Sequence, residues 1–204
     1  MRPGAAAAGL DPGAQSGPPG LSTMSGAKTS EIIVRPCFQQ DLQYVQLIYA
    51  HHCLTGTGTF EIEPPSLEEM TERWGKIVDR GWPFLVASPP SDFSRVLGFC
   101  YAAQFRDRAA YSKTFEVSIY TAPTTMHQGV GSQMLAQLLT TLRDDGVREV
   151  LAVIGDSYNA GSIGLHKKLG FKHVGTMTNV GEKFGRWLDV VIMQRSLPAK
   201  DAAS

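Results

Sequence analysis

The chain has 204 residues, 43% of them hydrophobic, which is enough for one domain with a sizeable core. Lysine and arginine total 19, as do aspartate and glutamate, so no net charge favours nucleic acid or an anionic membrane. No apolar run approaches the roughly 20 residues that cross a bilayer.

Residues 1–30 differ from the rest because they are almost entirely Gly, Ala, Pro and Ser. We expect this segment to be a disordered tail, with a second, shorter tail at 198–204. The first tail lacks the apolar segment of a secretory signal, and with one arginine it is a poor mitochondrial presequence. Met24 is an alternative start. The folded domain should therefore span 31–197.

The front half of that domain begins with one strand and two helices and continues with strands alone. In chain order, the patterns predict a strand at 31–35 stopped by Pro36, helices at 41–53 and 67–80, and strands at 83–87, 95–105 and 114–121. Ser66 with Glu69 forms a capping box for the second helix. The expected buried stripe of that helix is Leu67, Met70, Trp74, Ile77 and Val78.

The back half is organised around the strand at 114–121 and the helix that follows it. Phe115, Val117 and Ile119 alternate with polar residues, and the turn Gly129-Val130-Gly131 then opens a helix to about 145. The apolar stripe of this helix is Val130, Met134, Leu135, Leu138, Leu139 and Leu142. A strand at 149–154, a helix at 160–169 capped by Gly170, and strands at 172–179 and 187–195 complete the chain. The fold class is therefore α/β, a mixed sheet with helices on both faces.

The glycine turn is a candidate phosphate site. A glycine turn that opens a helix leaves main-chain N–H groups unpaired, with the positive end of the helix dipole behind them. It is not a Rossmann fingerprint, because Met134 stands where the third glycine would be, and it lacks the Gly-Lys-Ser/Thr of a P-loop. The turn can therefore hold a diphosphate, but it matches neither of these two common motifs.

Several blocks in this order resemble the GNAT superfamily of acetyl-CoA-dependent N-acetyltransferases, and within it the phosphinothricin/methionine sulfoximine acetyltransferase family. They are Glu116-Val-Ser-Ile-Tyr, the glycine turn, Asn159-x-x-Ser162-x-x-Leu165-His166-x-x-Leu169-Gly170-Phe171, Thr59-Phe60-Glu61 with Glu63-Pro64-Pro65, FRDRAAY at 105–111, and the pattern from Gly181 to Arg195. The resemblance covers about 31–197. It implies a GNAT fold of about seven mostly antiparallel strands, splayed mid-sheet, and a cytoplasmic homodimer.

The resemblance also assigns residues to acetyl-CoA, which is the co-substrate of this superfamily. The implied cofactor-binding residues are Val117, Ser118, Ile119, His127, Gln128, Gly129, Val130, Gly131, Ser132, Asn159 and Ser162. One departure is Met126, where the family usually has Arg or Gln. Because main-chain amides need no side chain to hold phosphate, we expect weaker CoA binding rather than none. Asn159 is also a good N-cap for its helix, and both roles are compatible.

The two candidate catalytic residues are Glu116 and His166. A mid-strand carboxylate is costly unless it has a partner or a role. Glu116 is therefore either an ion-pair partner of Arg106 or Arg108, or the base that deprotonates a substrate ammonium. His166 lies between Leu165 and Leu169, where a histidine is often only a core residue. The resemblance makes it the acid that protonates the CoA thiolate, or a second base.

The implied substrate-binding residues are Phe60, Arg106, Arg108 and Tyr111. Loop arginines often only keep a protein in solution, but guanidinium groups also match carboxylate or phosphinate oxygens. Of the two arginines, Arg108 matches the family pattern better.

Metal and thiol chemistry are the weaker alternatives. His51, His52 and Cys53 are adjacent on a helix and so point in different directions, and we expect no metal. For neither Cys53 nor Cys100 does the sequence indicate a positioned base that would activate the thiol as a nucleophile. With Cys37 the cysteines number three and are widely spaced, which favours a reducing, intracellular compartment.

The sequence thus predicts direct acetyl transfer to the α-amine of a small amino acid or amino-acid analogue. Two alternatives stay open: an enzyme of the same class acting on a polyamine or a protein amine, and a sensor that binds CoA esters without turnover. Arg106 and Arg108 count against cationic substrates, and the pair Glu116 and His166 counts against a sensor.

Overall fold

The computed structural model describes residues 31–125 and 128–199. The predicted tail 1–30, Met126, His127 and residues 200–204 lie outside this part. Within it, every helix is too short or too polar to cross a bilayer.

Seven strands form one sheet in the order β1-β2-β3-β4-β5-β7-β6. Their bounds are β1 (Ile33–Pro36), β2 (Phe84–Ser88), β3 (Gly98–Gln104), β4 (Thr114–Thr121), β5 (Glu149–Gly155), β6 (Lys172–Lys183) and β7 (Arg186–Ser196). Every neighbouring pair is antiparallel except β4 and β5, which are parallel. The predicted mixed, mostly antiparallel sheet is confirmed.

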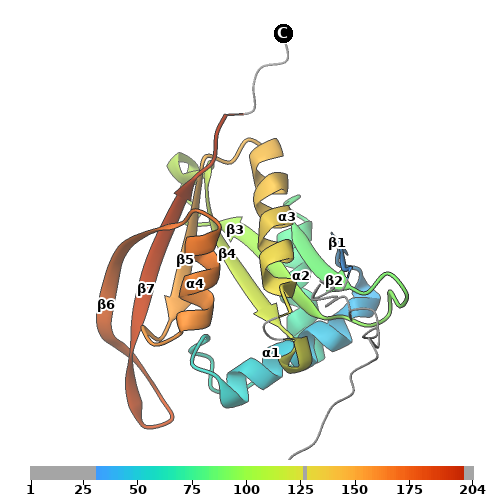
Figure 1. The fold of residues 1–204 in the computed structure, drawn as a ribbon, viewed down its shortest axis with the longest axis horizontal. Helices are drawn as coiled ribbons and strands as arrows, with labels where there is room; N and C mark the ends of the chain where they lie inside the picture. Colours follow the sequence, from blue (N-terminus) through green and yellow to red (C-terminus); the bar gives the residue numbers. More distant parts are fainter. Residues whose placement is uncertain (1–30, 126–127, 200–204) are drawn as a thin grey trace, which may run out of the picture.

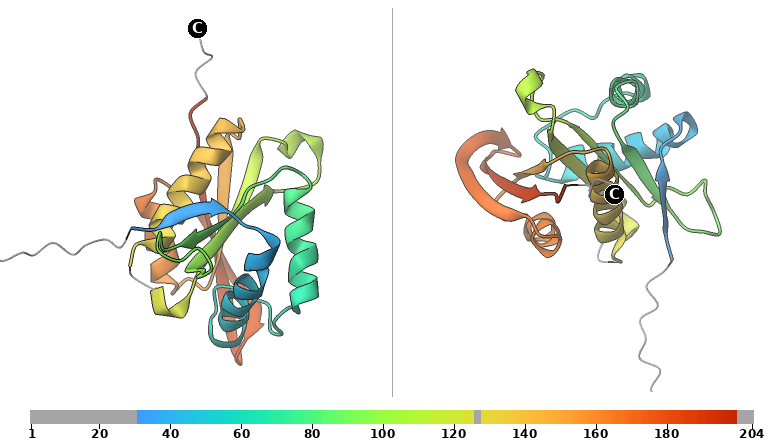
Figure 2. Two further views of the ribbon diagram at one scale, coloured as in Figure 1. Left: turned by 90° about the vertical axis from the view of Figure 1, so that its right-hand side faces the viewer. Right: turned by 90° about the horizontal axis from the view of Figure 1, so that it is seen from above.

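Four α-helices cover the two faces of the sheet (Figures 1 and 2). They are α1 (Leu42–Thr55), α2 (Leu67–Val78), α3 (Val130–Asp144) and α4 (Ala160–Lys168). Helices α1 and α2 lie on one face, and α3 and α4 lie on the other. Each face has its own apolar cluster, one beneath α3 and one beneath α1 and α2.

The periodicity of α3 was the most informative local signal. All six residues of its predicted apolar stripe are buried, and Gly170 follows α4 with a left-handed φ of +82°. In α2, Ser66 accepts a hydrogen bond from the amide of Glu69, as predicted for an N-cap. Leu67 was wrongly placed in the buried stripe, since 48% of it is exposed at the open first turn of the helix.

Three predicted strand boundaries also need correction. β3 begins at Gly98 rather than at 95, because the amide of Arg95 closes a turn on the carbonyl of Asp92. β6 runs to Lys183, beyond the predicted 179, since it continues its pairing with β7 past an irregularity. β1 includes Pro36, which an edge strand tolerates because one side needs no N–H donor.

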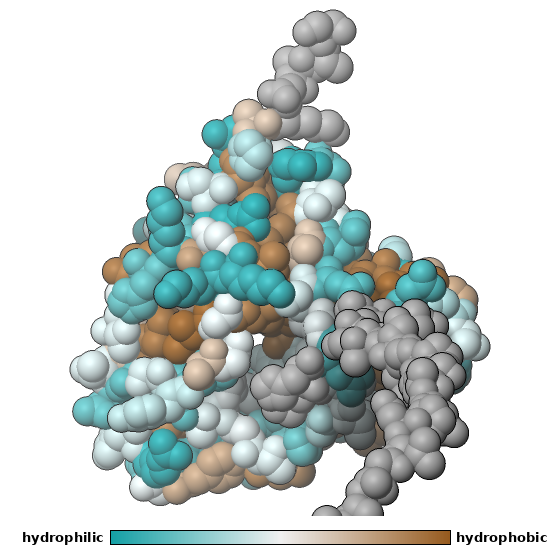
Figure 3. All heavy atoms as spheres, in the orientation of Figure 1, coloured by the Kyte–Doolittle hydropathy of each residue, from teal (hydrophilic) through white to brown (hydrophobic). Residues whose placement is uncertain are grey.

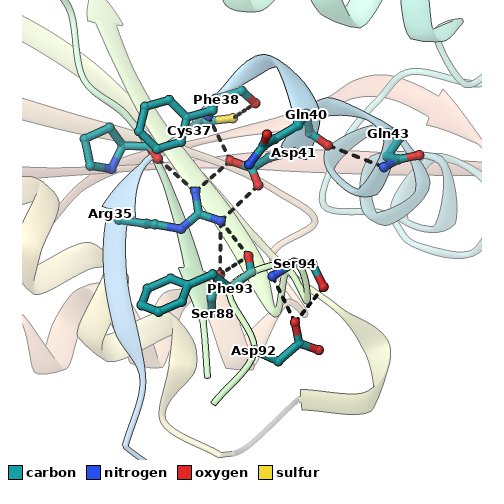
Figure 4. A network of polar contacts seen from close by, with 11 residues as sticks. Arg35, Cys37, Phe38, Gln40, Asp41, Gln43, Ser88, Asp92, Phe93 and Ser94 are labelled. Atoms are coloured by element: carbon teal, nitrogen blue, oxygen red, sulfur yellow. Dashed lines mark hydrogen bonds and ion pairs between the residues drawn. The ribbon is translucent and has the colours of Figure 1, made fainter. Parts of the chain in front are cut away.

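A buried ion pair joins β1 to the start of α1 (Figure 4). The guanidinium of Arg35 donates to both carboxylate oxygens of Asp41, at 2.7 and 2.9 Å, and to the carbonyl of Phe93 at 2.8 Å. Asp41 also accepts from the amide of Phe38 at 2.8 Å. One arginine therefore ties together the first strand, the first helix and the loop between β2 and β3.

Candidate active site

The cleft of the molecule lies where β4 and β5 part. These strands pair from Thr114 and Glu149 to Val117 and Ala152, and no further. A cavity of about 430 Å³ occupies the gap, lined by residues 118–121 of β4 and 153–154 of β5. The face in Figure 3 is hollowed there, between α3 and α4. Main-chain groups that a neighbouring strand would pair are thus free to meet a bound molecule.

The start of α3 forms a second wall. Gly129 has a left-handed φ of +82° that suits glycine, and Val130, Gly131 and Ser132 follow it along the cavity. The first amides of a helix have no partner within it and carry the positive end of its dipole. Gln128 is not on this wall, because its amide donates to Thr125 and its side chain to Thr124.

The start of α4 forms the third wall. The Oδ1 of Asn159 accepts from the amide of Ser162 at 3.1 Å, which confirms Asn159 as the N-cap. The Nδ2 of Asn159 lies 3.4 Å from the carbonyl of Gly155. Asn159, Ser162 and His166 all line the cavity.

His166 is buried, with one ring nitrogen paired and the other free. Its Nδ1 lies 2.8 Å from the carbonyl of Ser162, and a carbonyl only accepts, so Nδ1 carries the proton. Nε2 is buried and has no hydrogen-bond partner in the described part of the chain. Burial lowers the pKa of His166, and this effect outweighs the hydrogen bond to Ser162, which acts to raise it. His166 is therefore a neutral imidazole with a lone pair at Nε2, beside the cavity.

Glu116 approaches the cleft from the other face of the sheet. Phe115 and Val117 point into the core beneath α3, so Glu116, between them, points toward the α1 and α2 side. It pairs with Leu151, one rung before the strands part. Burial raises the pKa of Glu116, and the charge of Arg106 opposes this rise. No ion pair joins Glu116 to either arginine within residues 31–125 and 128–199, so the ion-pair reading finds no support.

The predicted substrate residues come from two separate places. The guanidinium of Arg106 lies 4.4 Å from the centre of the Phe105 ring, and Tyr111 meets the same ring edge-on at 5.7 Å. Arg108 is exposed at the start of the short 3-10 helix Ala109–Tyr111. Phe60 instead lies against the backbone of β5 and β6. Of these residues, Arg106 is the one whose positive charge lowers the pKa of Glu116.

His52 lines the cavity, although the sequence indicated it only as part of the inward face of its helix and as a poor candidate for a metal ligand. Its Nε2 lies 2.9 Å from the carbonyl of Thr121, at the end of β4 where β5 no longer pairs. Burial lowers the pKa of His52, so the ring is a neutral donor to that carbonyl. Its place on the inward face of α1 was the available signal, but nothing local to the sequence identified Thr121 as its partner.

The three cysteines are poor candidates for a nucleophile. All three cysteines are free and buried, and burial raises the pKa of each thiol, that of Cys37 to about 12. Since the thiolate is the nucleophile, this disfavours an acyl-cysteine. In the part of the chain that the structure describes, no three His, Cys, Asp or Glu residues come together as a metal site.

The comparison with known proteins agrees with this geometry. Residues 34–192 match the family model "Acetyltransferase (GNAT) domain". The chain is 44% identical to phosphinothricin N-acetyltransferase of Alcaligenes faecalis, over 82% of this chain and 84% of that protein. It is 34% identical to L-methionine sulfoximine/L-methionine sulfone acetyltransferase of Pseudomonas aeruginosa, over 83% and 97%.

Among solved structures, a phosphinothricin acetyltransferase from Sinorhizobium meliloti in complex with AcCoA is similar, with a TM-score of 0.78. It is 38% identical and matches 85% of this chain and 91% of that one. The parted strands, the helix start beside them and these relatives lead to one conclusion. The chain belongs to the GNAT family of acetyltransferases, which take their acetyl group from acetyl-CoA.

Proposed function

We propose that this enzyme acetylates the α-amine of a small amino acid or amino-acid analogue, such as phosphinothricin or methionine sulfoximine. The observation that carries the proposal is the cleft itself, with the buried, unpartnered Nε2 of His166 on one side and Glu116 on the other, at the closed end where β4 and β5 still pair. The names of the relatives support the substrate class, and so does the positive charge of Arg106, which acts on Glu116.

Acetyl-CoA would lie along the free edge of β4. The amides at 129–132 would hold its diphosphate, and Asn159 and Ser162 would contact the pantetheine arm. The edge at Val117, Ser118 and Ile119 would place the thioester, with a main-chain N–H steadying the oxyanion. This arrangement leaves the α1 and α2 face of the cleft for the amine.

The reaction then needs two proton transfers and no covalent enzyme intermediate. Glu116, directly or through water, takes one proton from the substrate ammonium. The free amine attacks the thioester carbon, the C–N bond forms, and the C–S bond breaks as the intermediate collapses. The second nitrogen proton passes to Nε2 of His166, the atom that the structure leaves unprotonated, and from there to the departing thiolate. The products are the N-acetyl amine and free CoA thiol.

The test is thiol release from acetyl-CoA across a panel of amines at equal concentration. Phosphinothricin, methionine sulfoximine and small amino acids should give the highest kcat/KM. Polyamines and a peptide with a free N-terminus should be poor substrates, because Arg106 and Arg108 repel cations. A higher rate with spermidine or the peptide would contradict the substrate class, and no thiol release with any amine would favour the sensor.

Replacing Arg106 should shift the pH dependence of turnover. The positive charge of Arg106 favours the carboxylate form of Glu116, so removing it raises the pKa of Glu116 further. The base form then appears only at higher pH. In Arg106→Gln the acid limb of the kcat/KM profile should move upward in pH, whereas Arg108→Gln should leave that limb in place. An unmoved limb in Arg106→Gln would remove Glu116 as the group that titrates there.

Replacing His166 should slow the chemical step. His166→Asn keeps a donor toward the carbonyl of Ser162 but loses the lone pair at Nε2, so turnover should fall about 10²-fold. Calorimetry should show little change in acetyl-CoA affinity. The matched control is His173→Asn, an exposed histidine on β6 that contacts only Thr176. Equal rates for the two variants would leave His166 a core residue.

We further propose a cytoplasmic homodimer, formed through β6 and β7. β6 is an edge strand, and the hairpin exposes apolar side chains, among them Val180, Phe184 and Trp187, the last 65% exposed. Sedimentation should give twice the 22.1 kDa chain mass, and Val180→Glu should return it to the monomer. Phe93→Glu, an equally exposed apolar site near the opposite edge, is the control. A monomeric wild type would contradict this interface.

A further inference from the structure

Lys183, at the end of β6, is almost fully removed from water. Only 3% of it is exposed, its Nζ donates to the carbonyl of Thr59 at 2.7 Å, and the ring of Phe184 lies 5.2 Å away. No carboxylate in residues 31–125 and 128–199 lies within ion-pair distance of this ammonium. Burying a charge without a contacting carboxylate is costly: burial lowers the pKa of Lys183, against the attraction of Glu61, so the hydrogen bond to Thr59 should have a use.

The contact holds the loop 56–63 between α1 and α2. Other hydrogen bonds tie the same loop to α1 and to the end of β5. The hydroxyl of Tyr49 on α1 shares a hydrogen bond of 3.1 Å with the hydroxyl of Thr59 and donates to the carboxylate of Glu61 at 2.9 Å. The hydroxyl of Thr57 donates to the carboxylate of Asp156 at 2.7 Å. Lys183 supplies the hydrogen bond from β6, across 124 residues of sequence.

The loop has little freedom to shift, because it packs directly against the backbone at two glycines, Gly155 and Gly181. A Cβ at Gly155 would lie 2.6 Å from the carbonyl oxygen of Thr57 and 3.0 Å from the ring of Phe60. A Cβ at Gly181 would overlap that ring from the other side. The loop also brings Gly58 to the cavity wall. Moving the Thr59 carbonyl would therefore move both Gly58 and Phe60.

We propose that Lys183 is a positioning residue for acetyl transfer, acting through the Thr59 carbonyl on the loop that brings Gly58 to the cavity wall. This rests on the proposed function, in which the amine enters the cavity from the side of α1 and α2, where this loop lies. No contact joins Lys183 to Glu116 or His166 in the described part of the chain. Loss of its hydrogen bond should therefore weaken amine binding without disturbing the chemical step.

The test compares Lys183→Met with Lys172→Met, an exposed lysine on the same strand. In Lys183→Met the KM for the amine should rise about tenfold, the effect of losing a charge-assisted hydrogen bond. The kcat and the KM for acetyl-CoA should stay within twofold, and Lys183→Arg should restore part of the amine KM. Lys172→Met should behave as wild type. An unchanged amine KM in Lys183→Met, or an equal loss in Lys172→Met, would overturn the proposal.

Amide hydrogen exchange of the free enzyme gives a second readout that needs no turnover. Exchange in 56–62 should quicken in Lys183→Met while α1 and β4 keep their protection. Unchanged exchange in the loop, or equal quickening throughout, would overturn the anchoring role even if no amine proves to be a substrate. Should Lys183→Met fail to fold, Lys183→Gln keeps a polar side chain that is too short to reach the Thr59 carbonyl. A raised amine KM there supports the proposal, and an unchanged one overturns it.

Discussion

Glu116→Gln should lower turnover by about 10³-fold and leave acetyl-CoA binding near that of the wild type. Glutamine has the size of glutamate but cannot accept the ammonium proton, so the amine stays in the form that cannot attack a thioester. Glu116 lies at the closed end of the cleft and is not among the residues that line the cavity, so the substitution leaves that lining intact. Steady-state kinetics and calorimetry on one preparation measure both effects.

The matched control for this substitution is Glu72→Gln, an exposed carboxylate on α2. It should keep the wild-type rate. Because burial raises the pKa of Glu116, the wild type should also lose activity on acidification at a higher pH than an ordinary carboxylate would allow. Near-wild-type turnover of Glu116→Gln from pH 6 to pH 9 would show that another group, or solvent, is the base.

Asp41→Asn should cause the largest loss of stability of the substitutions considered. The carboxylate is 2% exposed and accepts three hydrogen bonds, two of them from the guanidinium of Arg35. Asparagine leaves that guanidinium with no counter-charge and turns one acceptor into a donor that faces it. Breaking a buried pair on one side costs about 3–5 kcal/mol. For a domain of this size, that lowers Tm by on the order of 10 °C.

Asp92→Asn is the control for this result, because Asp92 lies in the same region but is exposed, and its carboxylate accepts from the amide and hydroxyl of Ser94 rather than from a buried guanidinium. Its Tm should be nearly that of the wild type. Thermal unfolding followed by circular dichroism compares the two variants. If Asp41→Asn melted within two degrees of Asp92→Asn, the ion pair would contribute little to the fold.

Local patterns in the sequence were enough to identify the framework of the fold. The stripe of α3, the caps at Ser66 and Asn159, and the glycine turn each depend on residues only a few positions apart. Such signals survive in a single sequence because helix periodicity and capping are set by near neighbours. Boundaries were less reliable where the partner was distant, as for the end of β6.

Contacts between distant segments were not predictable in the same way. Nothing near Lys183 indicates that its ammonium reaches the carbonyl of Thr59, and nothing near His52 indicates Thr121. The proton position on His166 depends on a carbonyl one turn away, which follows only once the ring orientation is known. The roles proposed for Glu116 and His166 come from family resemblance, and the structure adds the direction in which burial shifts the pKa of each and the faces from which they approach the cleft.

The central claim is a direct passage of acetyl from CoA to an α-nitrogen in the gap between β4 and β5. Mass spectrometry of the products formed from acetyl-CoA and methionine sulfoximine examines it most directly. The account predicts one N-acetyl product for each free thiol, no acetyl group left on the protein, and a near-complete loss of both products in Glu116→Gln. Thiol without acetylated amine, or an acetyl group trapped on the chain when the amine is withheld, would contradict it.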